Sequence, residues 1–403
     1  MWEQIRSNQI RSVVLTIGMG VLLILLGYFL GAAFDSAIAG LVIALLVWAI
    51  LSLIGYFQGD SILLSMSRAK KISRDDHPRL YNVVEEMKIA SGLEKMPDIY
   101  IIDDPALNAF ATGRDPNRAS VAITSGLLQK LNRDELQGVI AHEISHIKNR
   151  DVLLMAMCSI LLGTIVILAW YGSRLLIFGS MTGSRRSSSS GGGGQAQIII
   201  LVVSLVFMIL APIMAQLIYF AISRKREYLA DASAALYTRY PEGLASALEK
   251  LGTSTGQLKS ANKATAPMYI VNPFRKKGMR ASDLTSTHPP ISERIRILRA
   301  MAGASFNDYD QVYRQAHGGK GVIPAASIAA ETVPITTTKL EGEAGEPNEI
   351  QRARETSDVM WRLSNYNTIT CDCGAKLRVP PNFKEPQIKC PHCGRTHQVR
   401  EDG

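Results

Sequence analysis

The chain has 403 residues, enough for two or three domains, and 47% of them are hydrophobic. Its formal net charge is +9, a basic excess found in nucleic-acid-binding proteins and in membrane proteins whose cytoplasmic loops are rich in Lys and Arg. Cys158 lies alone in an apolar run, whereas the other four cysteines form two close pairs near the end of the sequence. This spacing favours a metal site and argues against a disulfide framework.

Four apolar stretches are long enough to cross a lipid bilayer, for which about 20 residues are needed. They run from Val13 to Phe34, from Ala37 to Phe57, from Val152 to Phe178 and from Ile198 to Phe220. The first two are predicted to form a tight hairpin. The first lacks the short apolar region and small-residue cleavage site of a signal peptide, so we interpret it as a permanent anchor. Buried core helices are the alternative interpretation, more so for the last two stretches.

Lys and Arg residues flank these stretches unevenly, and this bias predicts the orientation of the chain. If the four stretches alternate in direction, one side of the membrane receives Arg6, Arg11, Arg68, Lys70, Lys71, Arg74, Lys148, Arg150, Arg224, Lys225 and Arg226. The other side receives the two-residue hairpin turn and a loop with Arg174, Arg185 and Arg186. Both termini and the polar domains are therefore expected in the cytoplasm, which makes the protein a multi-pass protein of the cytoplasmic membrane.

The polar segments have distinct local signals. Residues 97–102 and 119–124 are predicted to be β-strands, and Asn132 followed by Glu135 predicts a capped helix start. The serine- and glycine-rich run at 187–194 predicts a flexible loop.

The helix that begins at Asn132 contains the sequence His142-Glu143-Ile144-Ser145-His146, an H-E-x-x-H pattern. Residues four apart lie on one helix face, so both imidazoles can bind one metal ion. Glu143 can then accept a proton from water whose pKa zinc lowers to about 7. Two surface histidines on an amphipathic helix are the alternative interpretation.

A catalytic zinc needs a third protein ligand and an open position. The metzincin pattern would place glycine and histidine where this chain has Asn149 and Val152, so that class is excluded. After the fourth apolar stretch, Glu227 and Asp231 are four apart and share a helix face. Glu227 can be the third ligand, and Asp231 can hydrogen-bond the free nitrogen of a zinc-bound histidine. On spacing alone, an exposed charge at a membrane boundary is an equally good interpretation of Glu227.

These two motifs together resemble the HtpX-type membrane zinc peptidases, which are relatives of the CAAX prenyl endopeptidases in the gluzincin group. Further matching segments are Asn108-Ala109-Phe110-Ala111-Thr112-Gly113-Arg114, Thr124-Ser125-Gly126-Leu127-Leu128 and His288-Pro289-Pro290 followed by Arg294-Ile295. The resemblance covers about residues 10–300, including the four apolar stretches. It implies zinc, endopeptidase activity, a cytoplasmic-membrane location, quality control of membrane proteins, and Glu227 as the third zinc ligand.

The resemblance also implies roles for two further places. Asn108 and Ala109 would lie on or beside an edge strand that pairs with an extended substrate, with an ordinary turn as the alternative. His288 would help to bind the oxyanion during catalysis, with a capping or packing histidine before a Pro-Pro turn as the alternative.

The distance from the motifs to the apolar stretches predicts where the site lies. His146 precedes Val152 by six residues, so a continuous helix would place zinc about 9 Å from the third stretch. Glu227 follows the fourth stretch by seven residues. The active site is therefore expected at the cytoplasmic membrane surface, which favours membrane-bound substrates or substrates with juxtamembrane loops.

The C-terminal tail carries a second candidate metal site. Cys371 and Cys373 form one pair, Cys390 and Cys393 form the other, and sixteen residues separate the pairs. This pattern is typical of a four-cysteine zinc ribbon, although the first pair is C-x-C and not C-x-x-C. A redox dithiol pair is the alternative. The tail is basic but has no aromatic stacking platform. Its sequence does not identify a binding partner.

We therefore expect a mostly α membrane protein with four transmembrane helices, an α+β zincin-type peptidase domain with an active-site helix, and a small C-terminal zinc ribbon. The expected parts are an N-terminal transmembrane hairpin at 1–57, a cytoplasmic zinc peptidase domain at 58–316 interrupted by transmembrane helices near 152–178 and 198–220, a flexible linker at 317–366 and the ribbon at 367–403. The expected cofactors are two zinc ions, one catalytic and one structural.

The expected function is that of a membrane-embedded zinc endopeptidase that hydrolyses peptide bonds of membrane or misfolded proteins in protein quality control and stress response. Its expected partners are protein or peptide substrates and the lipid bilayer. A catalytically silent zinc-binding scaffold that recruits partners through the ribbon is the alternative, and the intact Glu143 argues against it. A membrane-tethered nucleic-acid binder is less well supported, because much of the positive charge flanks the spans, where orientation alone explains it.

Overall fold

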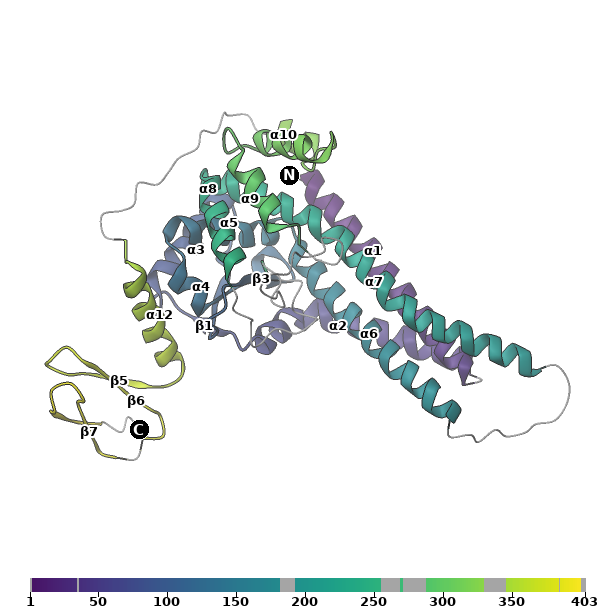
Figure 1. Ribbon diagram of the computed structural model, residues 1–403, viewed down its shortest axis with the longest axis horizontal. Helices are drawn as coiled ribbons and strands as arrows, with labels where there is room; N and C mark the ends of the chain where they lie inside the picture. Colours follow the sequence, from purple (N-terminus) through teal and green to yellow (C-terminus); the bar gives the residue numbers. More distant parts are fainter. Residues whose placement is uncertain are drawn as a thin grey trace.

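The computed structural model describes residues 2–34, 36–181, 193–254, 269–270, 288–329, 346–383 and 385–399. This part of the chain is mostly helical and has three regions (Figure 1). Long helices extend to one side, a body of shorter helices surrounds a small sheet, and a β-rich tail lies on the other side.

Four long helices form the extension: α1 (Trp2–Ala33), α2 (Ala37–Met66), α6 (Asp151–Met181) and α7 (Gly193–Thr238). Where the structure describes them, Thr16–Ala33 in α1 and Ala37–Met66 in α2 are long and apolar enough to cross a membrane. The predicted hairpin is thus confirmed as a pair of candidate spans. In α6 and α7 the apolar segments identified within the described residues are Ile160–Arg174 and Val202–Ala215, and a crossing by these two helices stays a prediction.

Small residues bring α1 and α2 into close contact. A Cβ atom on Gly27 of α1 would lie 2.3 Å from the Cβ atom of Ala44 on α2, so the contact leaves no room for a side chain. Small residues let helix backbones approach each other in lipid, where apolar side chains alone do not drive association. The hydroxyl of Ser204 on α7 donates a 2.8 Å hydrogen bond to the carbonyl of Phe29 on α1. The hairpin and α7 are therefore directly linked.

One sheet lies in the body, with the strand order β1-β2-β4-β3. Its strands are β1 (Lys70–Ile72), β2 (Asp98–Ile102), β3 (Ala109–Gly113) and β4 (Ala119–Thr124). β2 and β4 are parallel, and the other two pairs are antiparallel. Both strands predicted from the sequence are confirmed. Ile99 and Ile101 face the main core, whereas Ile102 faces a smaller cluster that includes Leu64 of α2.

The remaining helices of the body are α3 (Pro78–Ser91), α4 (Ser125–Lys130), α5 (Arg133–Lys148), α8 (Pro241–Thr253), α9 (Ile291–Arg299), α10 (Phe306–His317) and the one-turn 3-10 helix η1 (Pro116–Arg118). Asn132 and Glu135 form the predicted capping box at the start of α5. α5 is buried on all sides over residues 135–145. It meets α8 so closely that a Cβ atom on Gly138 would lie 2.6 Å from the backbone nitrogen of Leu244.

The expected continuous helix from His146 into the third apolar stretch is wrong. α5 ends at Lys148, and a separate helix, α6, begins at Asp151. Between them Arg150 has a φ of 57°, the left-handed conformation that ends a helix and changes the chain direction. This turn brings Asp151 back toward the H-E-x-x-H helix.

The expected flexible linker at 317–366 is wrong over part of its length. The structure shows α11 (Ala325–Ala329) and α12 (Glu349–Leu363) within it, and residues 330–345 lie outside the described part. α12 starts with a capping box at Asn348 and packs Val359 and Met360 into the core of the body. Its Leu363 carbonyl accepts a 2.8 Å hydrogen bond from Lys70 of β1. Of the predicted loop at 187–194, residues 187–192 are outside the described part and the last two glycines belong to α7.

The tail consists of two β-hairpins, built from β5 (Asn367–Thr370), β6 (Lys376–Val379), β7 (Gln387–Lys389) and β8 (Thr396–Gln398). Asp358 on α12 joins the tail to the body, since its carboxylate pairs with Lys376 at 2.6 Å and with Arg378 at 2.5 Å. The guanidinium of Arg378 also lies over the ring of Trp361.

Candidate metal centre

Three side chains from two helices meet inside the body. His142 and His146 lie on α5 and Glu227 lies on α7, and their ligand atoms are all within 4.8 Å of one another. The two Nε2 atoms are 3.3 Å apart. The carboxylate oxygens of Glu227 lie 3.6 Å from Nε2 of His142 and 3.5 Å from Nε2 of His146. These side chains therefore have their donor atoms directed to one point.

This donor set fits a zinc ion. Two nitrogens that each bind zinc at about 2.05 Å with tetrahedral geometry are about 3.3 Å apart, which matches the spacing of the two Nε2 atoms. Glu227 is nearly fully buried, and its Oε2 atom lies 3.3 Å from Nη1 of Arg294 without a hydrogen bond to it. Its two oxygens face the Nε2 atoms of both histidines, so this carboxylate can complete the set of three ligands that a catalytic zinc needs.

Asp231 and Arg294 hold the first histidine. Oδ1 of Asp231 lies 3.0 Å from Nδ1 of His142, and Arg294 donates to both carboxylate oxygens at 2.8 and 2.6 Å. Burial by itself would lower the pKa of His142, but the hydrogen bonds with Asp231 and Glu227 outweigh burial and raise it. Because Nδ1 faces a carboxylate, the Nε2 lone pair of His142 is left to face the metal position.

Asp151 and Arg226 surround the second histidine in a similar way. Oδ2 of Asp151 lies 3.3 Å from Nδ1 of His146, and Oδ1 accepts a 2.9 Å hydrogen bond from Arg226. Burial alone would lower the pKa of His146, but Asp151 and Glu227 outweigh it and raise the pKa to about 10. The sequence assigns Arg226 only to the charges that orient the chain, and it assigns Asp151 no role. The signal in the sequence for Asp151 is a carboxylate five residues after His146.

Glu143 lies beside the three candidate ligands between α5 and β3. Its side chain is buried, and burial raises the pKa of its carboxyl above the usual value. The backbone of Ala111 on β3 hydrogen-bonds to it, which lowers the pKa by a smaller amount. A carboxylate with a raised pKa is a better proton acceptor near neutral pH. Glu143 therefore has the environment that a general base needs.

His288 and the start of β3 also adjoin the site. Nε2 of His288 lies 3.9 Å from Oε2 of Glu227, and burial lowers the pKa of this imidazole to about 4. Asn108 is buried, and its backbone exchanges hydrogen bonds with Thr124. Ala109 begins the edge strand β3, and its carbonyl accepts a 3.0 Å hydrogen bond from Ile270. His288 is thus placed with the candidate ligands, whereas Asn108 stabilises the strand next to them.

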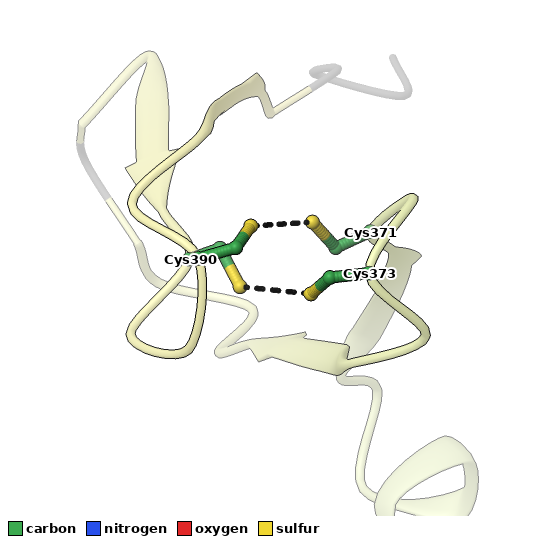
Figure 2. Close-up of side chains that lie close together, drawn as sticks. Cys371, Cys373 and Cys390 are labelled. Carbon is green, nitrogen blue, oxygen red and sulfur yellow. Dashed lines mark hydrogen bonds between the residues drawn. The ribbon is translucent and has the colours of Figure 1, made fainter.

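The four cysteines of the tail form a second candidate centre (Figure 2). The sulfurs of Cys371 and Cys393 are 3.4 Å apart, and those of Cys373 and Cys390 are 3.7 Å apart. These spacings approach the roughly 3.8 Å expected for tetrahedral zinc with Zn–S bonds of about 2.3 Å. The backbone N–H of Cys393 lowers the pKa of Cys390 to about 6, which favours the thiolate that binds metal.

The fold and the buried site are those of a metallopeptidase. Residues 74–302 match Peptidase family M48, and the chain belongs to this family. It is 45% identical over 300 residues to a protease HtpX homolog from Dictyoglomus turgidum, an alignment that covers 74% of this chain and 94% of the relative. A protease HtpX homolog from Streptococcus mutans is 44% identical over 299 residues, covering 74% of this chain and 99% of the relative. The chain is thus a zinc metallopeptidase of the HtpX type and a membrane protein.

Among solved structures, the crystal structure of S. mikatae Ste24p is similar with a TM-score of 0.39 and 20% sequence identity, and the match covers 74% of this chain and 67% of that chain.

Proposed function

We propose that this protein hydrolyses peptide bonds of membrane or misfolded proteins at the cytoplasmic surface of the membrane, in protein quality control. The observation that carries the proposal is the buried group of His142, His146 and Glu227 with Glu143 beside it. The helix that supplies Glu227 is also the helix that contains the apolar segment Val202–Ala215. The proposed site and the proposed membrane segment are therefore parts of one helix, in which Pro212 lies inside the apolar segment.

The proposed roles follow from the positions of the side chains. Zinc held by His142, His146 and Glu227 would act as a Lewis acid toward the scissile carbonyl and lower the pKa of water. Glu143 accepts the proton of the attacking water and then delivers it to the leaving amine. His288 lies on the Glu227 side of the site and would donate a hydrogen bond to the developing oxyanion.

The edge strand β3 is the proposed place of substrate binding. β3 is at the edge of the sheet, where an extended chain can pair with it. The carbonyl of Ala109 accepts a hydrogen bond from Ile270, so a substrate that pairs at this residue would have to replace that contact. The same strand runs past Glu143, since the backbone of Ala111 hydrogen-bonds to that carboxylate. A peptide on this edge would thus lie next to the proposed base.

The position of α2 supports a site at the membrane surface. Arg114, which directly follows β3, lies over the exposed rings of Tyr56 and Phe57 on α2, at 5.8 and 5.9 Å from their centres. Aromatic and cationic side chains gather where membrane helices leave the hydrocarbon layer. We infer four spans with both termini and the peptidase domain in the cytoplasm, and a second zinc ion in the ribbon.

A comparison of the wild type with Glu143→Gln tests the function. Both proteins are purified in detergent, stripped with a chelator and given zinc, and then bound zinc, self-cleavage and casein cleavage are measured. We expect two zinc ions in each protein and cleavage by the wild type only, because the substitution removes the base but no ligand. If the wild type binds both ions and cuts nothing, the scaffold function replaces this proposal.

A further inference from the structure

We propose that Asp151 and Arg226 are positioning residues that hold His146 in the orientation needed to bind metal. The inference rests on the proposed zinc site and extends it to two residues that are not expected ligands. Asp151 is the first residue of α6, and Arg226 precedes Glu227 on α7.

The Asp151 carboxylate is a bridge, because each of its oxygens has a different partner. Oδ2 lies 3.3 Å from Nδ1 of His146, and Oδ1 lies 2.9 Å from Nη1 of Arg226. The side chain of Asp151 is 0% exposed and that of Arg226 is 5% exposed. An aspartate that only stabilises the first turn of α6 requires neither a buried arginine at one oxygen nor an imidazole at the other. The two contacts therefore indicate a second role for Asp151.

The arrangement repeats the one around His142. There Asp231 faces Nδ1 of the imidazole, and Arg294 donates to that carboxylate at 2.6 and 2.8 Å. In both cases an arginine donates a hydrogen bond to a buried carboxylate, and the carboxylate faces Nδ1 of the imidazole so that Nε2 is free for the metal.

The two arrangements differ in the elements that supply them. For His142 the carboxylate comes from α7 and the arginine from α9, inside the body. For His146 the carboxylate and the arginine come from the two helices that carry the apolar segments Ile160–Arg174 and Val202–Ala215. The contact between α6 and α7 at their body ends therefore sets the orientation of one proposed ligand. The left-handed turn at Arg150 makes this possible, because it lets Asp151 reach back to α5.

The test measures the zinc affinity of full-length protein in detergent by competition with a chelator. We expect Asp151→Asn to weaken zinc binding at the peptidase site by about 10- to 100-fold, the effect of losing a group that orients a metal ligand. Arg226→Gln should weaken it by a smaller factor. The double variant should bind about as tightly as Asp151→Asn alone, because Arg226 acts through Asp151. Cobalt in place of zinc should show a changed absorption spectrum in both single variants.

Two controls carry matched chemical changes at exposed positions, Asp75→Asn and Lys225→Gln, and both should bind zinc as the wild type does. His146→Ala separates the two proposals. If it keeps the full zinc content, the zinc site itself is wrong. If it loses one zinc while Asp151→Asn keeps wild-type affinity and cobalt spectrum, only the positioning role is wrong. Loss of the helical circular dichroism signal in both single variants would assign these residues to folding and overturn the inference.

Discussion

The two candidate metal centres of this chain are organised in opposite ways. In the peptidase centre the candidate ligands come from α5 and α7, far apart in sequence, and the surrounding core buries them. In the ribbon all four cysteines come from two short turns, and Cys373 and Cys393 are exposed. The large core of the body surrounds its candidate ligands, whereas the buried core cluster of the ribbon consists of Cys371, Leu377 and Cys390, so metal binding should contribute more to the folding of the ribbon.

The ion pairs of the two centres also differ in how deeply they are buried. The peptidase centre contains buried carboxylate–arginine pairs, such as Asp231 with Arg294, whose side chains are both 0% exposed. The ribbon is held to α12 by more exposed pairs, in which Asp358 and Arg378 are each 30% exposed and Lys376 is 54% exposed. Breaking a buried pair is costly because the remaining charge stays in the interior, whereas a surface pair is screened by water.

The largest effect is expected for Arg294→Met. It leaves the Asp231 charge buried and removes a cation 3.3 Å from Glu227, so the body should lose about 3–5 kcal/mol of stability. Chemical denaturation followed by circular dichroism measures this loss. Arg296→Met is the control, since its side chain is 64% exposed. If the two variants are equally stable, the buried pair of Asp231 and Arg294 contributes no more than an exposed arginine. The contrast between buried charge in the peptidase centre and exposed charge in the ribbon would then be wrong.

Cys373→Ser tests the other side of the comparison. It removes one thiolate of the ribbon, so the bound zinc should fall by one ion and the tail should become sensitive to proteases. Casein cleavage should stay near the wild-type rate, because α12 packs into the body independently of the ribbon. A parallel loss of casein cleavage would mean that the two centres depend on each other.

The smallest effect is expected for Asp358→Asn. The variant loses two partly exposed ion pairs, with Lys376 and Arg378, each contributing about 0.5 kcal/mol. The ribbon should keep its zinc but be cut more readily near Tyr366 in limited proteolysis. Unchanged proteolysis would show that other contacts, such as Arg378 over Trp361, are sufficient to hold the tail.

Local patterns predicted local structure well. The H-E-x-x-H helix, its capping box at Asn132, two strands and the α1–α2 hairpin follow from short-range rules, and the structure agrees with each. The meeting of His142 and His146 with Glu227 was expected from helix spacing together with a resemblance, since spacing alone could not bring two helices together.

The failures have physical causes. Asp151 was missed because the sequence around Arg150 reads as an uninterrupted helix, and a left-handed non-glycine residue gives no strong signal. Arg226 was counted as an orientation charge, although it is buried. The helix α12 was missed because the composition of 317–366 was averaged over a segment whose last part has a capping box and an apolar stripe.

The length of α7 has a mechanical consequence. This single helix of 46 residues contains both Val202–Ala215 and Glu227, and Pro212 inside the apolar segment removes one backbone donor from it. Glu227 is about 22 Å from Pro212 along the axis, and a tilt of about 5° about that proline would displace the carboxylate by about 2 Å. Membrane helices tilt when bilayer thickness changes. A displacement of this size is comparable to a metal–ligand bond length, so if α7 crosses the membrane as proposed, the lipid around it would affect the geometry of the site.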